Sequence, residues 1–198
     1  MTTRVIVPHR GLDAAKTRLA PVLTAAERGD LAAHLLRRVL RIALQAVSDV
    51  VVISPSATLA ELVEPMGARL LVQRGLGLNE GLGQARDAAE QEGVETLAVL
   101  HGDLPELQVD DVQALLEAIP DPTGVAVAPD RAGTGTNGLA LRPPGAIAFH
   151  FGVGSFAAHQ AAASGANIPL SVVQREGLAF DLDTPEDLRR WLASGVLA

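Results

Sequence analysis

Short runs of apolar, often β-branched residues alternate along the chain with longer stretches in which apolar residues recur every three or four positions. The short runs predict buried strands, and the longer stretches predict amphipathic helices. The expected strands are 4–8, 49–54, 68–73, 96–100 and 124–129, and the expected helices are 24–47, 57–66, 79–92 and 109–119. Because the strand runs are apolar almost without interruption, they indicate a mostly parallel sheet covered by helices on both faces.

The pattern loosens in the last third of the chain. Residues 137–141 and 168–173 are expected to be two further strands, with a glycine-rich loop and a helix between them. No linker and no internal repeat interrupts the sequence, so residues 1–198 are expected to form a single domain. In an open parallel sheet, ligands bind at the C-terminal ends of the strands. Residues that directly follow strands are therefore the first candidates for a functional site.

Composition and charge narrow the classes of function. The chain is 48% hydrophobic and 20% charged, which excludes a disordered protein, and its net charge of −7 disfavours a nucleic-acid partner. With no cysteine, disulfides and thiol chemistry are excluded. No apolar run approaches the roughly 20 residues of a membrane helix, and the start of the chain does not resemble a signal peptide. We expect a cytoplasmic protein that binds phosphate groups only locally.

Two basic residues, Lys16 and Arg18, follow the first expected strand in the loop PHRGLDAAKTRLAP (8–21). Taken singly, each is typical of a solvated surface turn. Taken together beside a ligand, they would clamp a triphosphate, with lysine as a point charge and arginine as a bidentate fork. The residue pattern leaves both interpretations open.

A glycine-rich segment, RGLGLNEGLGQA (74–85), follows the third expected strand. Its glycine spacing differs from the dinucleotide fingerprint, and it does not follow the first strand, so dinucleotide binding is disfavoured. We instead expect a tight loop whose backbone and Asn79 lie near a nucleotide base or ribose. Asn79 is also expected to be the N-cap of the helix that follows.

Three later loops combine carboxylates, hydroxyls and glycines. Asp103 in LHGDLPEL is either a helix cap or a metal ligand. The segment 128–141, APDRAGTGTNGLAL, is either a β-hairpin turn or a site for phosphate or carboxylate. In HFGVGSFAAH, glycines lead to Ser155 at a helix start, where free N–H groups would favour an anion. The five histidines show no metal-ligand spacing, and none is assigned a ligand role.

The segment FDLDTPEDL (180–188) holds four carboxylates. Its second half predicts a helix start with a capping box and proline at the first helical position. Asp181 and Asp183 precede that helix on an extended segment, where residues i and i+2 point the same way, so we expect them to converge on one ion. Together with Asp103 they would supply three hard oxygen ligands, a set that suits Mg²⁺.

Six segments in this order and at these distances resemble one known family: AKTRLAP, GLN, GDLP, APDRAGTGTN, FGVGSF and LAFDLDTPEDL. They resemble the guanylyltransferases of coenzyme F420 biosynthesis, known as CofC or FbiD, over nearly the whole chain. The resemblance implies a GT-A-like nucleotidyltransferase fold, a Rossmann-like three-layer α/β/α sandwich that binds a nucleotide with Mg²⁺. It also implies transfer of GMP from GTP to 2-phospho-L-lactate or phosphoenolpyruvate, with release of pyrophosphate.

The resemblance assigns roles to individual positions. The basic residues near the GTP phosphates are Lys16 and Arg18, and the metal ligands are Asp103, Asp181 and Asp183. The residues that bind the phosphate and carboxylate of the acceptor are Thr136, Gly152 and Ser155, with Thr134 as the alternative register of the same loop. In the implied mechanism the acceptor phosphate attacks the α-phosphorus of GTP in line.

The chain departs from the family pattern in two places. Residues 8–10 are Pro-His-Arg where members often have Pro-x-Lys, and residues 102–106 are Gly-Asp-Leu-Pro-Glu where they often have Ala-Asp-Leu-Pro-Leu. Alternatives are a molybdenum-cofactor guanylyl- or cytidylyltransferase, or a non-catalytic nucleotide-binding regulator. The acceptor stays open among 2-phospholactate, phosphoenolpyruvate and 3-phosphoglycerate. Exposed apolar surface on the Leu-rich helix 24–47 would favour a homodimer.

Overall fold

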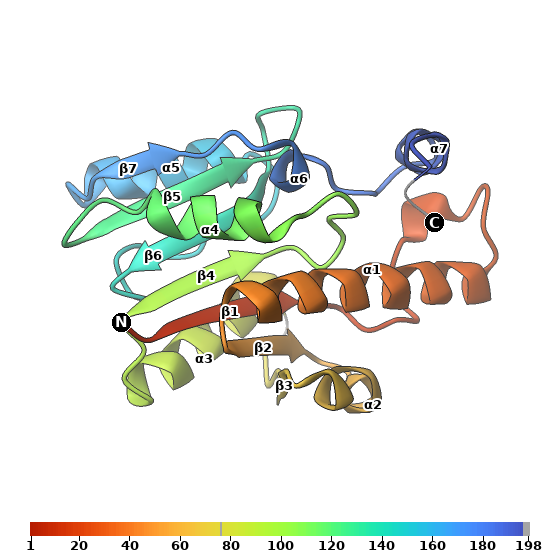
Figure 1. Ribbon diagram of the computed structural model, residues 1–198, viewed down its shortest axis with the longest axis horizontal. Helices are drawn as coiled ribbons and strands as arrows, with labels where there is room; N and C mark the ends of the chain where they lie inside the picture. The colour runs from red at the N-terminus through yellow and green to blue at the C-terminus, as the bar shows by residue number, and fades with distance from the viewer. Residues whose placement is uncertain (76, 196–198) are drawn as a thin grey trace.

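The computed structural model describes residues 1–75 and 77–195, and its described strands form one twisted sheet (Figure 1). The strands are β1 (Thr3–Pro8), β2 (Asp49–Ser54), β3 (Arg69–Val72), β4 (Thr96–Leu100), β5 (Gly124–Pro129), β6 (Thr136–Arg142) and β7 (Leu170–Val172). Their order across the sheet is β3-β2-β1-β4-β6-β5-β7. Among these strands β6 alone runs antiparallel to its neighbours. The expectation of a mostly parallel sheet is therefore confirmed.

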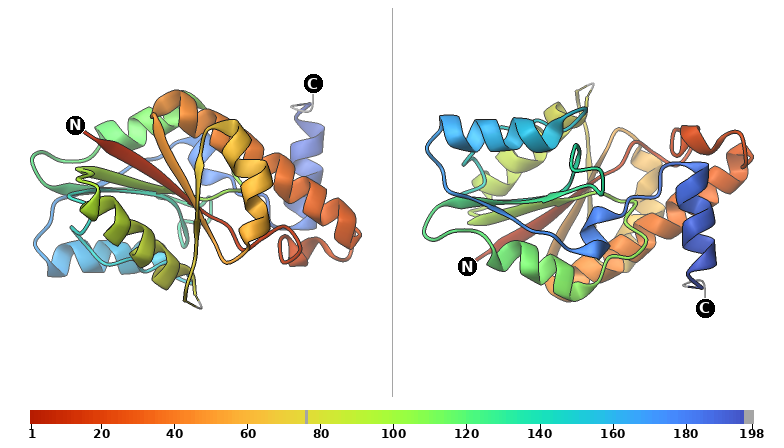
Figure 2. Two further views of the ribbon diagram at one scale, coloured as in Figure 1. Left: turned by 90° about the horizontal axis from the view of Figure 1, so that it is seen from below. Right: turned by 90° about the horizontal axis from the view of Figure 1, so that it is seen from above.

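Helices cover both faces of the sheet, as the apolar strands predicted. The α-helices are α1 (Ala25–Ala46), α2 (Ala60–Val63), α3 (Leu78–Gln91), α4 (Val109–Glu117), α5 (Ser155–Gly165), α6 (Glu176–Ala179) and α7 (Pro185–Ala193). Single turns of 3₁₀-helix are η1 (Thr17–Leu19), η2 (Ala57–Leu59) and η3 (Glu64–Met66). Figure 2 shows α1 and α4 on one side of the sheet and α3 and α5 on the other, which gives the three layers.

The alternation of side chains along each strand divides the core in two. In β1, Val5 and Val7 pack into the layer under α1 and α4, whereas Ile6 packs into the layer over α3 and α5. Successive side chains of a strand point to opposite faces, so a strand buried on both faces must be apolar at every position. Burial on both sides is thus the physical reason for the uninterrupted apolar runs.

A third apolar cluster anchors the C-terminal helix beside the strand ends. Phe180, Leu182 and Trp191 are buried against Leu19 and Leu35 of the N-terminal third of the chain. Helix α7 begins with the predicted capping box between residues 184 and 187, and α1 begins with the one predicted at residues 24–27. The alternating pattern of segment 180–183 buries residues 180 and 182 and leaves the two aspartates on the other side.

Several details differ from the predictions. The expected helix 57–66 is a chain of three short segments, η2, α2 and η3, and the short helix α6 was not expected. Helix α3 begins one residue early, with Gly77 rather than Asn79 at its N-cap position. The large apolar residues of α1 pack inside the chain, and none of them is among the exposed large hydrophobic residues of the described part. The predicted exposed apolar surface on this helix is therefore wrong, and the homodimer stays a prediction.

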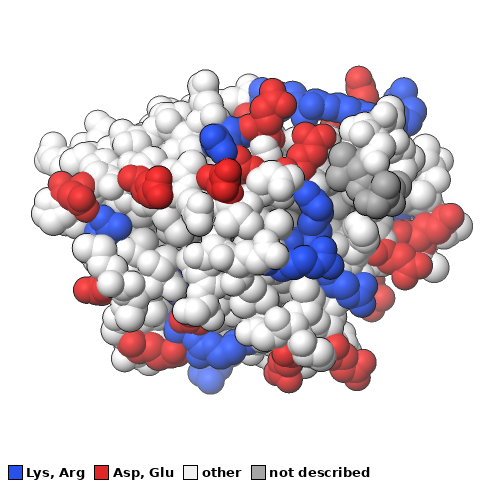
Figure 3. Space-filling model, in the orientation of Figure 1, with Lys and Arg blue, Asp and Glu red and all other residues white. Residues whose placement is uncertain are grey.

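Charge on the outer surface is unevenly distributed. On the face seen in Figure 3, Lys and Arg gather in a band that Asp and Glu border on several sides. No described helix combines the length and the apolar composition that crossing a lipid bilayer requires.

Candidate active site

A cavity of about 790 Å³ opens at the C-terminal ends of the parallel strands. Loops after β1, β2, β3, β4 and β5 reach it. The first residues of β6 join them because this strand runs the opposite way, so that Thr136 pairs with Pro129 at the end of β5. The cavity is lined by most of the residues singled out from the sequence. These are Lys16, Arg18, Asp103, Thr136, Gly152, Ser155, Asp181 and Asp183, whereas Asn79 and Thr134 lie outside the lining.

Lys16 is the only lysine of the sequence, and it is buried inside the cavity. Its side chain is 6% exposed, and its ammonium nitrogen lies 2.6 Å from Asp103 Oδ2 and 3.2 Å from Asp183 Oδ1. Burial acts to lower the pKa of Lys16, but the two carboxylates outweigh it and raise the pKa, so the ammonium stays charged. Its backbone is left-handed, with φ of 54°. The solvated-turn interpretation is wrong for Lys16.

Arg18 differs from Lys16 although it is only two residues away. Its side chain is 74% exposed, and one guanidinium nitrogen lies 3.3 Å from Asp183 Oδ2. The exposed arginine thus stands at the rim of the cavity, where a solvent-screened ion pair contributes little to stability. Asp183 therefore accepts hydrogen bonds from both basic residues.

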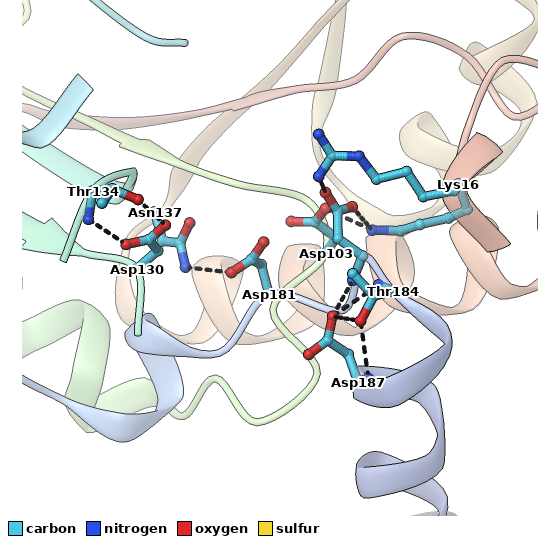
Figure 4. A network of polar contacts seen from close by, with 10 residues as sticks. Lys16, Asp103, Asp130, Thr134, Asn137, Asp181, Thr184 and Asp187 are labelled. Carbon is cyan, nitrogen blue, oxygen red and sulfur yellow. Dashed lines mark hydrogen bonds and ion pairs between the residues drawn. The ribbon is translucent and has the colours of Figure 1, made fainter. Parts of the chain in front are cut away.

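Two further carboxylates face the same space (Figure 4). Asp103 Oδ2 binds Lys16, whereas Asp103 Oδ1 is buried and has no hydrogen-bond partner in the described residues. Asp181 accepts a hydrogen bond from Asn137 Nδ2 at 3.2 Å, and burial together with the charge of Asp103 raises the pKa of Asp181. The backbone N–H of Leu182 donates to the carbonyl of Asp103 at 3.1 Å. This bond holds the two acidic segments side by side.

The alternative role of Asp103 as a helix cap is wrong, because α4 begins after Gln108, whose capping box is completed by Asp111. No group of three or more His, Cys, Asp or Glu side chains in residues 1–75 and 77–195 is arranged to hold a metal ion by itself. Even so, the donor set consists of hard oxygens, and the buried Oδ1 of Asp103 has a free acceptor site. Mg²⁺ is commonly bound by one or two carboxylates together with substrate phosphates and water. These carboxylates therefore fit a magnesium ion that arrives with a nucleotide.

Uncharged hydroxyls line another part of the cavity. Thr136 and Ser155 are each 2% exposed, and Thr136 Oγ1 lies 3.1 Å from Nδ1 of the buried His159. Gly152, with φ of 134°, adopts a backbone conformation that side chains rarely tolerate, although space for a Cβ is available there. The loop therefore requires glycine for its backbone path.

Helix α5 begins at Ser155 as predicted, but its first amides are not free. The N–H of Ser155 donates to the carbonyl of Gly152, and the N–H of Phe156 donates to the carbonyl of Thr134. The expectation of free helix N–H groups is wrong for these two residues. An anion here would be bound chiefly by side-chain hydroxyls.

The segment 128–141 is indeed a β-hairpin, formed by β5 and β6. The turn is closed by Asp130, which accepts hydrogen bonds from the backbone N–H of Thr134 at 2.8 Å and from its hydroxyl at 3.4 Å. Thr134 is exposed and committed to this turn, whereas Thr136 faces the cavity. Of the two registers that the sequence left open, the hairpin brings Thr136 to the cavity.

Asn79 does not cap α3, and its carboxamide is occupied. Asn79 Nδ2 donates to the carbonyl of Phe151 at 3.0 Å, and Asn79 Oδ1 accepts from the N–H of Phe151 at 2.9 Å. The residue therefore ties α3 to the loop that carries Gly152. Two glycines of the expected tight loop, Gly81 and Gly83, lie within α3 instead.

Sequence reasoning assigned no role to several residues of the lining, among them His9, Gln73 and Asn137. Gln73 Nε2 donates to the carbonyls of Gly75 and Gly77 and so shapes the loop before α3. His9 is held by the N–H of Gly11, which donates to Nδ1 at 3.0 Å, and burial lowers the pKa of His9 to about 4. His9 and Gln73 directly follow β1 and β3, and Asn137 lies near the start of β6, so all three stand where a strand meets the cavity. The sequence indicates this position but does not identify the hydrogen-bond partner of each residue.

Known proteins are similar to this chain over nearly its whole length. The family model described as "Guanylyl transferase CofC like" matches residues 3–196. The phosphoenolpyruvate guanylyltransferase of Sphaerobacter thermophilus is 46% identical over 190 residues, which cover 95% of this chain and 91% of that protein. The phosphoenolpyruvate guanylyltransferase of Rubrobacter xylanophilus is 43% identical over 196 residues, which cover 98% of this chain and 96% of that protein.

Solved structures support the predicted fold class. A Desulfovibrio desulfuricans G20 protein assigned as a nucleotide-diphospho-sugar transferase matches with a TM-score of 0.75 at 19% identity, over 95% of this chain and 85% of that one. At this level of identity the likeness bears on the fold alone, and it confirms the GT-A-like α/β architecture. The family match covers nearly the whole sequence and includes every segment that reaches the cavity. The chain therefore belongs to the CofC-like guanylyl transferase family and is a nucleotidyltransferase.

Proposed function

We propose that this protein transfers GMP from GTP to phosphoenolpyruvate, which yields a diphosphate-linked guanosine and pyrophosphate. Two relatives at 46% and 43% identity carry the name of this activity. The observation that carries the proposal is the cavity itself, which combines a buried ammonium, three neighbouring carboxylates and a pair of buried hydroxyls. The proposed setting is coenzyme F420 biosynthesis in the cytoplasm.

Charge in the cavity supports a nucleotide triphosphate accompanied by a cation. The lining contains Lys16 and two arginines, but also four aspartates. A triphosphate placed against these carboxylates would be repelled unless a further positive charge accompanied it. The residues proposed to hold Mg²⁺ are Asp103, Asp181 and Asp183, two of which now accept hydrogen bonds from Lys16. When bound, the ion would neutralise charge on the phosphates and orient them.

The proposed reaction exchanges one phosphoanhydride bond for another. A phosphate oxygen of the acceptor forms a bond to the α-phosphorus of GTP, and the bond from that phosphorus to the oxygen bridging to the β-phosphate breaks. The departing pyrophosphate takes the bonding electrons. Because the acceptor phosphate is already anionic, no strong general base is required, and catalysis depends on positioning and electrostatics. Lys16 and Arg18 are proposed to stabilise the pyrophosphate as it leaves.

The hydroxyls are proposed to bind the acceptor. Thr136 and Ser155 present neutral donors, and Gly152 lets the backbone of the loop pass close to a ligand. Phosphoenolpyruvate carries a phosphate and a carboxylate on the same carbon, so a compact group of donors can contact both. Neutral donors keep the acceptor phosphate nucleophilic, because they do not neutralise its negative charge as an ion pair would.

A pyrophosphate-release assay with four nucleoside triphosphates, each combined with phosphoenolpyruvate, 2-phospholactate and 3-phosphoglycerate, tests the proposal. We expect rapid release with GTP and phosphoenolpyruvate in the presence of Mg²⁺, and loss of release when the metal is chelated. Omission of the acid is the control for plain hydrolysis. Preference for another nucleotide or another acid would replace the proposed substrate while keeping the nucleotidyl transfer, and absence of release in every combination would refute the proposal.

A further inference from the structure

A buried histidine beside the cavity, His159, has no role in the proposed mechanism. His159 lies on α5, one helical turn after Ser155, and is 0% exposed. A buried polar side chain is costly unless it is hydrogen-bonded, and both ring nitrogens of His159 have a partner. One of those partners is Thr136, which lines the cavity.

The contacts of His159 determine which ring nitrogen carries the proton. The backbone N–H of His150 donates to His159 Nε2 at 3.0 Å, so Nε2 must present its lone pair. Burial, followed by the neighbouring charge of His150, lowers the pKa of His159 to about 4, so the ring is neutral near pH 7. A neutral imidazole has one N–H and one acceptor nitrogen. The hydrogen is therefore on Nδ1.

The direction of the next hydrogen bond follows from that tautomer. Nδ1–H faces Thr136 Oγ1 across 3.1 Å, and the ring also has the backbone of Ser155 as a hydrogen-bond partner, so in the pair with Thr136 the threonine oxygen is the acceptor. The hydroxyl hydrogen of Thr136 cannot point back at Nδ1, which already carries a hydrogen. It is left for another acceptor, and Thr136 lines the cavity where the acceptor substrate is proposed to bind.

Packing against neighbouring groups also restricts rotation of the His159 ring. Phe151 packs edge-on against His159, with ring centroids 5.0 Å apart. The backbone of Phe151 is held in turn by both polar atoms of the Asn79 carboxamide. The imidazole thus cannot rotate without disturbing the loop that continues into Gly152. Its hydrogen bond to Thr136 joins β6 to α5, and its contact with the N–H of His150 joins α5 to this loop.

We propose that His159 is a positioning residue that makes the Thr136 hydroxyl a committed donor toward an anionic oxygen of the acceptor substrate. This role rests on the proposed function, because it assigns the acceptor to the part of the cavity around Thr136 and Ser155. This His159–Thr136 relay favours an anion, because a hydroxyl oxygen that already accepts a hydrogen bond from Nδ1–H is a poor acceptor for a second donor. The chemical class recognised is a carboxylate or phosphate oxygen, not a hydroxyl or amide donor.

Two substitutions separate the two ring nitrogens. In His159→Asn, the side-chain amide nitrogen lies as many bonds from Cβ as Nδ1, so the donor toward Thr136 is kept and the contact with His150 is lost. In His159→Gln, the amide group lies at the distance of Nε2, so a contact with His150 is kept and the donor toward Thr136 is lost. Both variants are expected to lower the melting temperature. Only His159→Gln is expected to raise KM for phosphoenolpyruvate, by about tenfold, with KM for GTP unchanged.

A double-mutant cycle tests the path through Thr136. Thr136→Val alone is expected to raise KM for phosphoenolpyruvate about tenfold, and adding His159→Gln should increase it little further, because both changes remove the same donor. His150→Asn, at an exposed neighbouring histidine, keeps the backbone N–H that His159 accepts from and is the matched control. Additive effects, or equal effects of the Asn and Gln variants on KM, would overturn the assignment.

Nitrogen NMR of the histidines gives a test that does not depend on turnover. In the free protein, His159 should show a protonated Nδ1 and an unprotonated Nε2, and the opposite tautomer would overturn the proposal. Failure of the proposed function would instead appear as no pyrophosphate release by the unaltered protein. In that event the binding of phosphoenolpyruvate, measured by calorimetry for both His159 variants, decides whether the relay serves this ligand.

Discussion

Two parts of the cavity differ in the interactions that they offer a ligand: one offers ion pairs, and the other offers hydrogen bonds from uncharged groups. The charged part, made of Lys16, Asp103, Asp181 and Asp183, is an ion-paired cluster whose partners would change when a nucleotide and a cation arrive (Figure 4). The neutral part consists of the lining residues Thr136 and Ser155 and of His159 behind them; all three are buried, and both ring nitrogens of His159 already have a protein partner. The charged part supplies charges whose ion pairs can rearrange. The neutral part supplies hydrogen-bond donors whose orientation is fixed before the substrate binds.

This difference suits the two substrates proposed. A triphosphate carries several negative charges, and its pyrophosphate leaving group gains charge during the reaction. Charged groups that can change partners stabilise that developing charge. An acceptor anion needs orientation for in-line attack, which a rigid donor provides. Substitutions in the charged part should therefore lower kcat, whereas substitutions in the neutral part should raise the acceptor KM. The predictions below test this division.

The largest effect is expected for Asp181→Asn. The change keeps the shape of the side chain and its proximity to Asn137 but removes a negative charge proposed to hold the cation. We expect kcat to fall at least about 100-fold at saturating Mg²⁺, or roughly 3 kcal/mol of transition-state stabilisation. Steady-state pyrophosphate release measures it. Asp30→Asn, at an exposed position on α1, is the control. Near-normal turnover by Asp181→Asn would show that Asp181 does not hold the cation.

Lys16→Met should give the next largest effect and separate two roles of the charged part. We expect kcat to fall about 30-fold, since the leaving pyrophosphate loses its buried cation. Binding of Mg²⁺ should become tighter, because Asp103 and Asp183 no longer have an ammonium between them. Turnover and metal titration calorimetry measure the two quantities. Arg41→Met, an exposed basic residue of α1, is the matched control. Weaker metal binding in Lys16→Met would contradict the idea that the ammonium competes with the ion.

A smaller effect, confined to the acceptor, is expected for Ser155→Ala in the neutral part. The loss of one buried hydroxyl should raise KM for phosphoenolpyruvate about tenfold and leave KM for GTP within twofold. Thr134→Ala, which alters an exposed hydroxyl in the hairpin turn, is the control and should change neither constant much. If the threonine variant changed the acceptor KM more than the serine variant, the assignment of the two hydroxyls would be reversed.

The smallest effect concerns stability and pH. The pKa of His159 is lowered to about 4 in the folded protein, so below its usual value near 6.5 the unfolded chain binds a proton that the folded chain does not. The stabilisation from the neutral ring is complete above that value and is lost as the pH falls toward 4. His9, whose pKa is also lowered to about 4, acts in the same direction. Each should cost about 1 kcal/mol between about pH 7 and about pH 5.5.

Urea unfolding at the two pH values measures this loss, and His159→Gln should remove roughly half of it. His34→Gln, at an exposed histidine on α1, is the control. A pH dependence that is the same in both variants would show that other groups dominate acid destabilisation.

Sequence reasoning reached some residues of the site more securely than others. The aspartates at 103, 181 and 183 were identified because hard oxygen ligands follow strands or precede a capped helix, and all three line the cavity. Lys16 and Arg18 could not be distinguished, since both are basic residues of one loop. The difference between 6% and 74% exposure arises from the turn at η1, which directs only Lys16 inward.

Asn79 shows the limit of local reasoning. Asparagine near a helix start favours an N-cap, and that preference is weak compared with a bidentate contact to another loop. The carboxamide instead satisfies two backbone groups of Phe151, which would otherwise be buried without partners. Nothing in residues 74–85 indicates that segment 150–155 would lie alongside.

The sequence alone determined the layers, the strand and helix succession, the two capping boxes and the edge at which ligand-binding residues gather. These features follow from hydrophobic periodicity and from interactions within a few residues, so they can be read locally. Tertiary structure decided the partners: Lys16 with Asp103 across 87 residues, Asn79 with Phe151 across 72, and Thr136 with His159 across 23. Such pairs depend on how the sheet and helices pack, because a hydrogen bond requires positions accurate to a few tenths of an ångström.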